Sequence, residues 1–268
     1  MSSMMRPLAE FSLQDRQAVR AVLFDIDDTL TTDGKLTAEA YDAMEDLQAA
    51  GFLLAPITGR PAGWCDHIAR MWPVDGVVGE NGAFYFRHDA DSQRMIRHYA
   101  QDEETRAAFR RRLDELCRQI LAEVPGSALA SDQFSRQADL AIDFREDVPA
   151  LPMAAAERIV ALFQAAGAQA KISSIHVNGW FGDHDKLSMT RQFLLRETSL
   201  DPDADNGTIV FVGDSPNDAP MFGFFRNAVG VANLSTFKGR LDAEPRFLTD
   251  AASGAGFAEL ARALIDAR

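Results

Sequence analysis

The sequence predicts an α/β protein in which a doubly wound, Rossmann-like parallel sheet carries an inserted α/β domain. Short apolar segments alternate with amphipathic ones, which is the pattern of parallel strands joined by helices. A long segment with strands and helices of its own interrupts this alternation in the middle of the chain. Such an interruption is expected where one domain is inserted into another.

The length and composition of the chain fit this prediction. Its 268 residues can bury a large core, and 47% of them are hydrophobic. The 40 acidic residues outnumber the 27 Lys and Arg residues, which gives a formal net charge of −13. Nucleic acids and anionic membranes attract cationic surfaces, so the composition argues against both as partners.

The sequence also indicates where the protein resides. It contains no run of about 20 uninterrupted apolar residues, the length that a membrane helix needs. The first residues lack the apolar centre of a secretory signal, so we expect a cytoplasmic protein without membrane contact. Cys65 and Cys117 lack the spacing of a metal site and are expected to be reduced thiols.

Three apolar segments are expected to be strands of the parallel sheet, and each is followed directly by polar residues. They are residues 21–24, 53–57 and 208–212. A helical pattern over residues 38–50, closed by Gly51, joins the first two, and residues 228–231 are a further strand. Ligands of open α/β sheets lie outside the carboxyl ends of the strands, so we expect these polar residues to meet there.

The interrupting segment is the predicted inserted domain, placed at residues 84–182. An amphipathic helix is expected over residues 102–124, a strand over 140–144, a second helix over 152–166 and one or two strands over 169–180. Residues 18–83 and 183–268 would then form the core domain, preceded by an N-terminal extension over residues 1–17.

Asp25 and Asp27 follow the first strand, two residues apart. In an extended backbone both side chains can project past the sheet edge toward one ligand. One carboxylate can attack phosphorus, and the other can protonate the departing alcohol and then activate water. Two carboxylates repel a phosphate dianion, so this chemistry requires a cation, and oxygen ligands favour Mg²⁺. The alternative is a polar turn that caps the next helix.

The other two strand ends offer groups that complement these carboxylates. Thr58, Gly59 and Arg60 follow the second strand with a hydroxyl, unhindered N–H groups and a guanidinium, which together can hold phosphoryl oxygens. Asp214 and Asp218 follow the third strand, where Asp214 can complete a metal shell. For each segment the alternative is a turn without a catalytic role.

Together these segments resemble the motifs of the haloacid dehalogenase superfamily of phosphatases. The motifs are Asp-Ile-Asp-Asp-Thr-Leu at 25–30, Ile-Thr-Gly-Arg at 57–60, Lys186 at the start of a helix, and Gly-Asp-Ser-Pro-Asn-Asp at 213–218. The first two motifs leave no room for a domain between them, whereas a long segment separates the second from Lys186. The resemblance therefore implies the type IIB branch with a large α/β cap, which includes Cof-type, sucrose-phosphate and mannosyl-3-phosphoglycerate phosphatases.

The resemblance implies a Mg²⁺-dependent hydrolase that acts through an aspartyl phosphate on a small phosphate monoester such as a sugar phosphate. Asp25 would be the nucleophile and Asp27 the general acid and base. Thr58 and Lys186 would hold the transferring phosphoryl group. The Mg²⁺ ligands would be Asp25, the carbonyl of Asp27, Asp214 and, in or just behind the metal shell, Asp218.

Two positions depart from the common pattern of the family. Asp28 stands where Cof-type sequences usually have Gly, which leaves the subfamily open without affecting the chemistry. Leu187 stands where a Gly commonly follows the motif lysine.

Residues near the ends of the inserted domain are candidates for substrate binding. The segment 80–83 resembles the Glu-Asn-Gly-Ala element that leads into the cap in this branch, which makes Asn81 a candidate. Ser174, His176 and Asn178 alternate with apolar residues and are predicted to share one strand face that can contact sugar hydroxyls. For His176 a purely structural role is the alternative. The expected substrate-binding residues are Gly59, Arg60, Asn81, His176 and Asn178.

Two other functions are compatible with these motifs. A phosphomutase of the same fold would return the phosphoryl group to its substrate, but such enzymes typically carry Gly-Gly-Asn-Asp where this chain has Ser-Pro-Asn-Asp at 215–218. A non-catalytic sugar-phosphate-binding protein would not need the catalytic residues, and every expected one is present.

Overall fold

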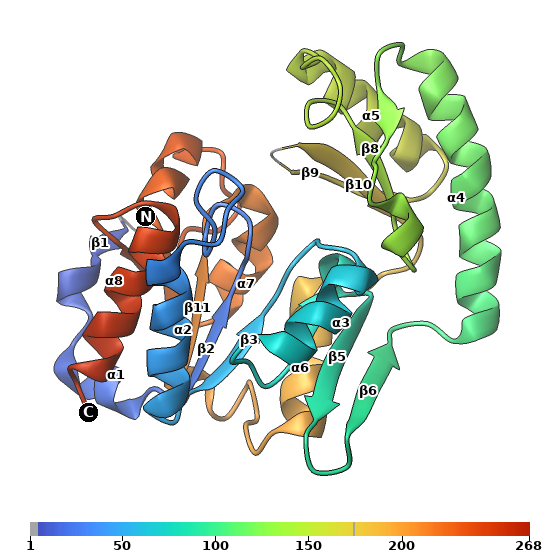
Figure 1. Cartoon of the computed structure of the whole chain (residues 1–268). Helices are drawn as coiled ribbons and strands as arrows, with labels where there is room; N and C mark the ends of the chain where they lie inside the picture. The colour runs from blue at the N-terminus through green and yellow to red at the C-terminus, as the bar shows by residue number, and fades with distance from the viewer. Residues whose placement is uncertain (1–4, 174) are drawn as a thin grey trace.

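A six-stranded parallel sheet forms the larger lobe of the structure, a computed structural model that describes residues 5–173 and 175–268 (Figure 1). The strand order is β1-β13-β12-β11-β2-β3, and every pairing is parallel. The parallel sheet predicted from the sequence is therefore confirmed. Its strands are β1 (Arg6–Pro7), β2 (Ala21–Phe24), β3 (Leu53–Pro56), β11 (Ile209–Gly213), β12 (Asn227–Gly230) and β13 (Phe247–Leu248).

Helices cover both faces of this sheet, as in a doubly wound fold. Val22 and Val212 pack on one face with α2 and α8, and Leu23 and Phe211 pack on the other with α6 and α7. Successive residues of a strand point to opposite faces, so these strands are apolar throughout. The helices of the larger lobe are α1 (Leu13–Ala18), α2 (Ala38–Ala49), α3 (Ala62–Met71), α6 (Lys186–Glu197), α7 (Ala219–Phe224) and α8 (Ser253–Ile265).

The central strands β11, β2 and β3 end at one edge of the sheet. Phe24, the last residue of β2, pairs with Val212 in β11 and with Pro56 in β3. The residues that follow the three strands are therefore neighbours in space, as the sequence predicts.

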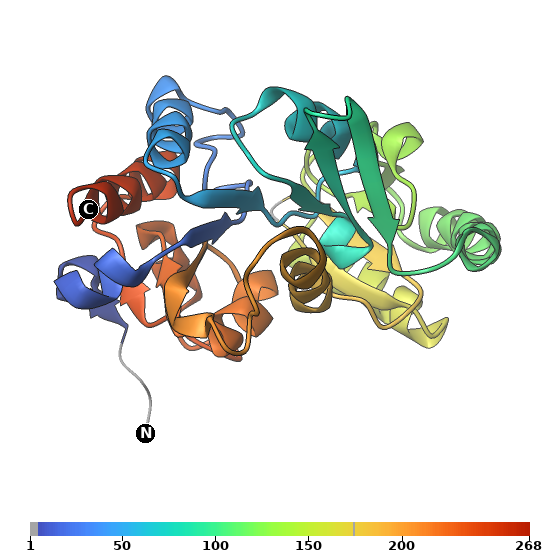
Figure 2. The ribbon, with the colours of Figure 1, turned by 90° about the horizontal axis from the view of Figure 1, so that it is seen from below.

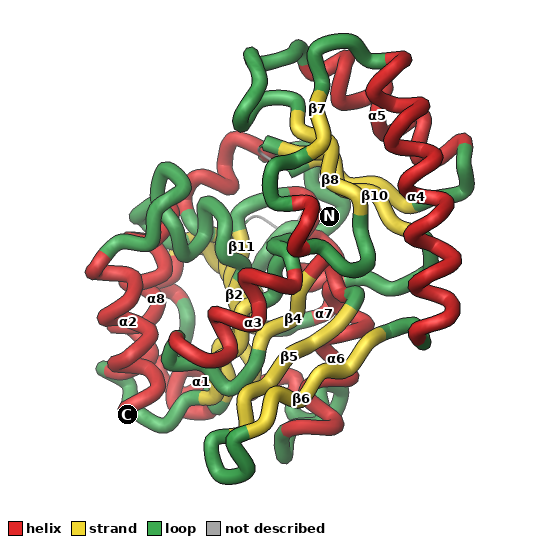
Figure 3. The backbone as a smooth tube through the Cα atoms, turned by 45° about the vertical axis from the view of Figure 1, so that its right-hand side comes forward, coloured by secondary structure: helices red, strands yellow, loops and turns green. Residues whose placement is uncertain are grey.

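The smaller lobe contains a four-stranded antiparallel sheet of order β7-β8-β10-β9. Helices α4 and α5 lie on one side of this sheet, away from the larger lobe (Figures 1 and 3), and form with it a separate hydrophobic core. The elements occur in the predicted order. They are α4 (Glu103–Glu123), β7 (Ala128–Leu129), β8 (Leu140–Asp143), α5 (Met153–Ala165), β9 (Gln169–Ile172) and β10 (His176–Trp180).

A third sheet, of order β4-β5-β6, lies beside β3 in the larger lobe (Figure 2). Ile57 forms a parallel bridge with Val78 in β4, and Tyr85 in β5 packs into the core beneath the parallel sheet. Residue 84, expected to begin the inserted domain, thus belongs to a hairpin of the larger lobe, because a strand pattern does not say which sheet the strand joins. We propose that the insertion begins near residue 102. The strands are β4 (Val77–Gly79), β5 (Phe84–Asp89) and β6 (Arg94–Tyr99).

The N-terminal segment is part of the larger lobe. The first strand pairs with Phe247 and Leu248, and Phe11 stacks on Phe247 with ring centroids 4.7 Å apart. The described portion of the extension expected over residues 1–17 therefore completes the sheet edge. None of the helices in the described residues is long and apolar enough to cross a membrane.

Candidate active site

Three carboxylates and one ammonium group form a buried cluster at the carboxyl edge of the parallel sheet. Asp25 follows β2, Asp214 follows β11, and each places an oxygen within 4.8 Å of the others and of Asp218. The Lys186 ammonium donates to Asp25 at 2.7 Å and to Asp218 at 2.8 Å. Lys186 is the first residue of α6, and the side chain of Asp185 caps that helix. Four residues singled out in the sequence are thus in one place.

The cluster carries more negative than positive charge. Burial raises the pKa of Asp25 to about 7, and the repulsion from Asp218 and Asp27 adds to this effect while Lys186 opposes it. Burial likewise raises the pKa of Asp214 to about 9, together with the repulsion from Asp25 and Asp218. A divalent cation would relieve this repulsion, and carboxylate oxygens are hard ligands of the kind that bind Mg²⁺. The residues present therefore fit a Mg²⁺ site.

Thr29 and Asn233, which the sequence analysis did not single out, hold Asp214 in place. The Thr29 hydroxyl and the Asn233 amide each donate to its carboxylate at 3.3 Å. The same amide nitrogen donates to the carbonyl of Asp28 at 3.0 Å, so it ties the turn after β2 to the turn after β11. Thr29 belongs to the first motif, whereas no pattern in the sequence marks Asn233.

The carboxylate of Asp27 points to Arg60 and not to the cluster. The Arg60 Nε lies 3.0 Å from both carboxylate oxygens, and a terminal nitrogen lies 2.6 Å from Oδ1. The guanidinium also lies over the ring of Trp64, 4.3 Å from its centroid. The Asp27 side chain is 35% exposed, so this pair stands on the solvent side of the buried cluster.

The loop next to Arg60 is formed by Thr58 and Gly59, and Asn81 packs against it. The fully buried Thr58 hydroxyl accepts the N–H of Arg60 at 3.1 Å, and the Asn81 N–H donates to the Thr58 carbonyl at 3.1 Å. Gly59 lies so close to the Asn81 side chain that a Cβ on it would stand 3.1 Å from Oδ1. The predicted residues of this loop therefore contact one another.

Glu80, not predicted as a site residue, joins the two lobes. Its fully buried carboxylate accepts the N–H of Ala62 at 2.9 Å in the larger lobe and those of Gln137 at 2.9 Å and Ala138 at 2.6 Å in the smaller. Burial and the nearby Asp139 raise the pKa of Glu80 to about 7, while Arg136 and the N–H donors lower it. This contact fixes the smaller lobe against the start of α3.

A second connection between the lobes is made by Arg136. Its guanidinium donates to the carbonyl of Gly59 and to the carboxylate of Asp139, both at 3.1 Å. The amide nitrogen of Asn178 donates to the same carboxylate at 2.9 Å. Asn178, expected to contact the substrate, therefore belongs to the network that holds the lobes together.

His176 lies on the same face of the smaller sheet as Asn178, as predicted, and Ser174 lies outside the described residues. The Nε2 atom of His176 is 2.9 Å from a carboxylate oxygen of Glu146. Glu146 was not singled out in the sequence, because a glutamate in a polar turn carries no distinctive pattern.

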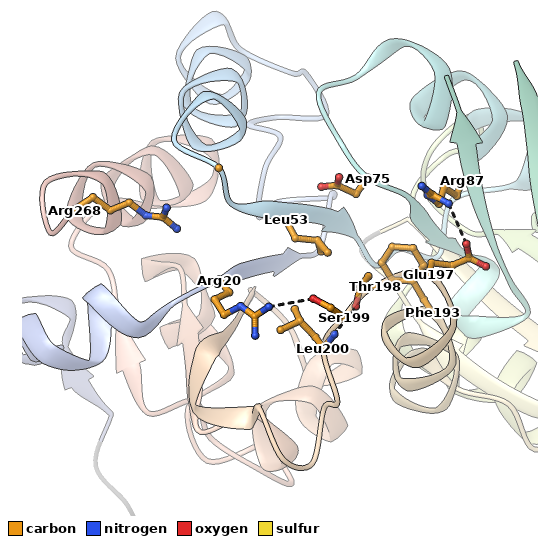
Figure 4. A pocket seen from close by; sticks show the side chains of 11 residues that line it. Arg20, Leu53, Asp75, Arg87, Phe193, Glu197, Thr198, Ser199, Leu200 and Arg268 are labelled. Carbon is orange, nitrogen blue, oxygen red and sulfur yellow. Dashed lines mark hydrogen bonds and ion pairs between the residues drawn. The ribbon is translucent and has the colours of Figure 1, made fainter. Parts of the chain in front are cut away.

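A cavity of about 370 Å³ lies at the opposite edge of the parallel sheet (Figure 4). It is lined by Arg20 before β2, by Leu53 in β3 and by Glu197 at the end of α6. None of the predicted site residues lines it. Ligands of such sheets lie at the carboxyl ends of the strands, so this cavity is not the candidate active site.

Gly82 sets the position of Lys186. Its φ is +100°, and an added Cβ would stand 1.9 Å from the carbonyl oxygen of Asp185. We expect Gly82→Ala to lower the free energy of unfolding by roughly 3 kcal/mol, because the left-handed backbone and the close contact each carry a cost. Urea denaturation measures the free energy of unfolding. Gly34→Ala is the control, since Gly34 also has positive φ but open space around it, and an equal loss in both variants would contradict the prediction.

The sequence model of the haloacid dehalogenase-like hydrolases matches residues 22–139. The match covers less than half of the chain. The matched part contains the turns with Asp25, Asp27 and Thr58 and the linking residue Glu80. A search among curated protein sequences finds no match.

Solved structures share the fold along nearly the whole chain. The C-terminal domain of the trehalose-6-phosphate phosphatase of C. albicans has a TM-score of 0.73 at 14% identity and covers 99% of both chains. A Cof-like hydrolase from Plasmodium vivax has a TM-score of 0.67 at 16% identity over 96% of this chain and 100% of that one. The sucrose-phosphatase of Synechocystis, solved with sucrose and phosphate, has a TM-score of 0.62 at 16% identity over 92% and 97%. These structures share the α/β fold that was expected from the sequence, and that fold is confirmed.

Proposed function

We propose that this hydrolase is a Mg²⁺-dependent phosphatase of small phosphate monoesters, of the sugar-phosphate type. The buried cluster of Asp25, Lys186, Asp214 and Asp218 carries the proposal, because it combines a carboxylate nucleophile with the positive charge that a phosphoryl group needs. The structural likeness to a sucrose-phosphatase and a trehalose-6-phosphate phosphatase supports a sugar phosphate as the substrate.

The proposed reaction has two displacements at phosphorus. In the first, an Asp25 oxygen bonds to phosphorus, the bond to the leaving oxygen breaks, and Asp27 gives its proton to the departing alcohol. In the second, Asp27 takes a proton from water, the water oxygen bonds to phosphorus, and Asp25 departs as inorganic phosphate forms. The position of the Asp27 side chain on the solvent side of the cluster, where water and a departing alcohol would have access, supports this role.

The residues that contact the phosphoryl group would be Thr58 and Lys186, which flank Asp25. Lys186 donates to Asp25 directly, so it would lower the repulsion between this carboxylate and the phosphate. Asp25, Asp214, Asp218 and the Asp27 carbonyl would hold Mg²⁺, which when bound offsets the charge of the substrate and the carboxylates. The smaller lobe, tied to Gly59 by Arg136, would cover the site as a cap.

A measurement of the inorganic phosphate that the protein releases tests this proposal. Purified protein with Mg²⁺ is expected to release inorganic phosphate from several sugar phosphates, and chelation with EDTA should lower the rate by roughly 100-fold or more because the carboxylates then repel the substrate. Added Mg²⁺ should restore it. Absence of phosphate release across a broad panel of monoesters, from folded protein with Mg²⁺, would refute the proposal. Conversion of substrate without phosphate release would indicate a phosphomutase instead.

A further inference from the structure

One face of the sheet in the smaller lobe is turned away from that lobe's hydrophobic core. Val177 and its cross-strand partner Ile142 pack into the core with α4 and α5. Side chains alternate along a strand, so His176 and Asn178 project from the opposite face. Asn178 reaches the network of Asp139 and Arg136, which contacts Gly59. This face is therefore turned toward the candidate active site.

A buried aspartate builds the turn that borders this face. Asp143 is the cross-strand partner of His176 and is almost fully buried. Its carboxylate accepts the backbone N–H groups of Arg145, Glu146 and Asp147, each at 2.8 Å. The Asp147 carboxylate in turn accepts the hydroxyl of Ser131 at 2.8 Å. These bonds fix the backbone of the turn and hence the origin of the Glu146 side chain.

The Glu146 carboxylate lies against His176 on one side and is open on the other. His176 Nε2 lies 2.9 Å from one of its oxygens, and the two side chains are 3% and 37% exposed, respectively. Burial lowers the pKa of His176, so the imidazole is neutral near pH 7 and leaves the carboxylate charge unbalanced. Glu146 thus keeps hydrogen-bond acceptors that are accessible from the solvent side.

Glu146 influences Arg60 electrostatically. Burial lowers the pKa of Arg60, but the negative charges of Asp27, Glu146 and Asp132 raise it above its ordinary value. Arg60 contacts Asp27 directly, so its guanidinium senses the charge of the proposed general acid as well as that of Glu146. Asp132 is neutralised by two bonds from Arg136, at 3.0 and 3.1 Å. Among these acidic groups Glu146 is the one whose observed partner is a neutral side chain.

We propose that Glu146, which lies beside His176, determines substrate specificity by accepting hydrogen bonds from hydroxyl groups of an uncharged leaving group. Carboxylates form strong hydrogen bonds with hydroxyls, and they repel a second phosphate or a carboxylate at the same place. The inference rests on the proposed phosphatase function, because it assigns the leaving-group side of the same site.

Lys171 provides the matched comparison. It is the cross-strand partner of Asn178, so it shares the face with His176, and it is exposed at the sheet edge. A leaving group that carries negative charge would use Lys171 and avoid Glu146. Glu146 therefore predicts a preference for an uncharged leaving group, and Lys171 predicts a preference for an anionic one.

The test compares Glu146→Gln with Lys171→Met on three substrates: a sugar phosphate such as trehalose 6-phosphate, the anionic 3-phosphoglycerate, and p-nitrophenyl phosphate, whose leaving group has no sugar hydroxyls. Glu146→Gln is expected to lower kcat/KM for the sugar phosphate by about 10- to 100-fold, mainly through KM, and to change that for p-nitrophenyl phosphate by less than about 3-fold. His176→Phe should reproduce the rise in KM. Lys171→Met should have little effect on the sugar phosphate.

Unchanged KM for the sugar phosphate in Glu146→Gln would overturn the proposal. It would also be overturned if the wild-type protein preferred 3-phosphoglycerate and only Lys171→Met lowered kcat/KM. A second measurement is independent of turnover: calorimetric titration of the sugar phosphate into the Asp25→Asn variant with and without Glu146→Gln. The added substitution is expected to weaken binding by about 10-fold, and equal affinities would refute the role of Glu146. Wild-type protein that binds the sugar phosphate through Glu146 but never releases phosphate would refute only the phosphatase function.

Discussion

Replacing Asp25 by Asn is expected to lower phosphate release by roughly 10³-fold or more, the largest effect that we predict for a single substitution. An amide is a far weaker nucleophile than a carboxylate. The neighbouring carboxylates cannot substitute for it, because Asp27 is bound by Arg60 and the fully buried Asp218 is held by Lys186 and by backbone N–H groups. Phosphate release under single-turnover conditions measures the loss.

The structure offers a control for this substitution. Asp28 lies three positions after Asp25 in the same turn, with a φ of +58° that Asn tolerates well, and no contact joins its side chain to Lys186 among the described residues. Asp28→Asn is therefore expected to keep most of the activity. Asp25→Asn should remain folded, since the substitution preserves shape and removes a charge whose burial is unfavourable. More than about a tenth of wild-type turnover in the folded Asp25→Asn variant would contradict the assignment of the nucleophile.

Replacing Lys186 by Met is expected to affect both stability and turnover. Its ammonium is the cation that contacts the buried Asp25 and Asp218, and its loss leaves these carboxylates without a compensating charge. Breaking a buried pair of this kind costs about 3 to 5 kcal/mol of unfolding free energy in the absence of metal. Turnover should fall by roughly 100-fold or more, because the phosphoryl oxygens lose a charged donor.

Denaturation with and without Mg²⁺ distinguishes this explanation from simple loss of packing. Mg²⁺ is expected to restore part of the lost stability, because it binds the folded cluster and reduces the same repulsion. The exposed Lys238 provides the control, and Lys238→Met should change stability by less than about 0.5 kcal/mol. Equal stability of Lys186→Met and wild type without metal would show that the carboxylates are not repelling one another in the folded protein.

Much of the larger lobe could be predicted because its signals are local. The apolar segments that became β2, β3 and β11 each end at a polar residue, and the general rule that such ends converge placed Asp25, Thr58 and Asp214 together. The helix that starts at Lys186 also carried a local signal, the capping residue Asp185. Periodicity alone predicted the helices of the smaller lobe.

The features that were missed depend on contacts between residues far apart in the sequence. No local pattern shows that the Glu80 carboxylate meets the N–H groups of residues 137–139, or that Arg136 reaches the carbonyl of Gly59. The pairing of β5 with β4, on which our proposed boundary near residue 102 rests, is likewise set by packing and has no local signal. Glu146 became a candidate only when Asp143 and His176 were seen around it.

Strand β2 lies between β3 and β11 in the sheet, although the ribosome makes these strands at very different times. β2 and β3 are close in sequence, but β11 is synthesised only after the whole smaller lobe. Domains of a growing chain fold as units, so the smaller lobe is expected to fold on the ribosome while the larger lobe still waits for its central strand. Asp25 therefore emerges early but meets Lys186 and Asp214 only when synthesis is nearly complete.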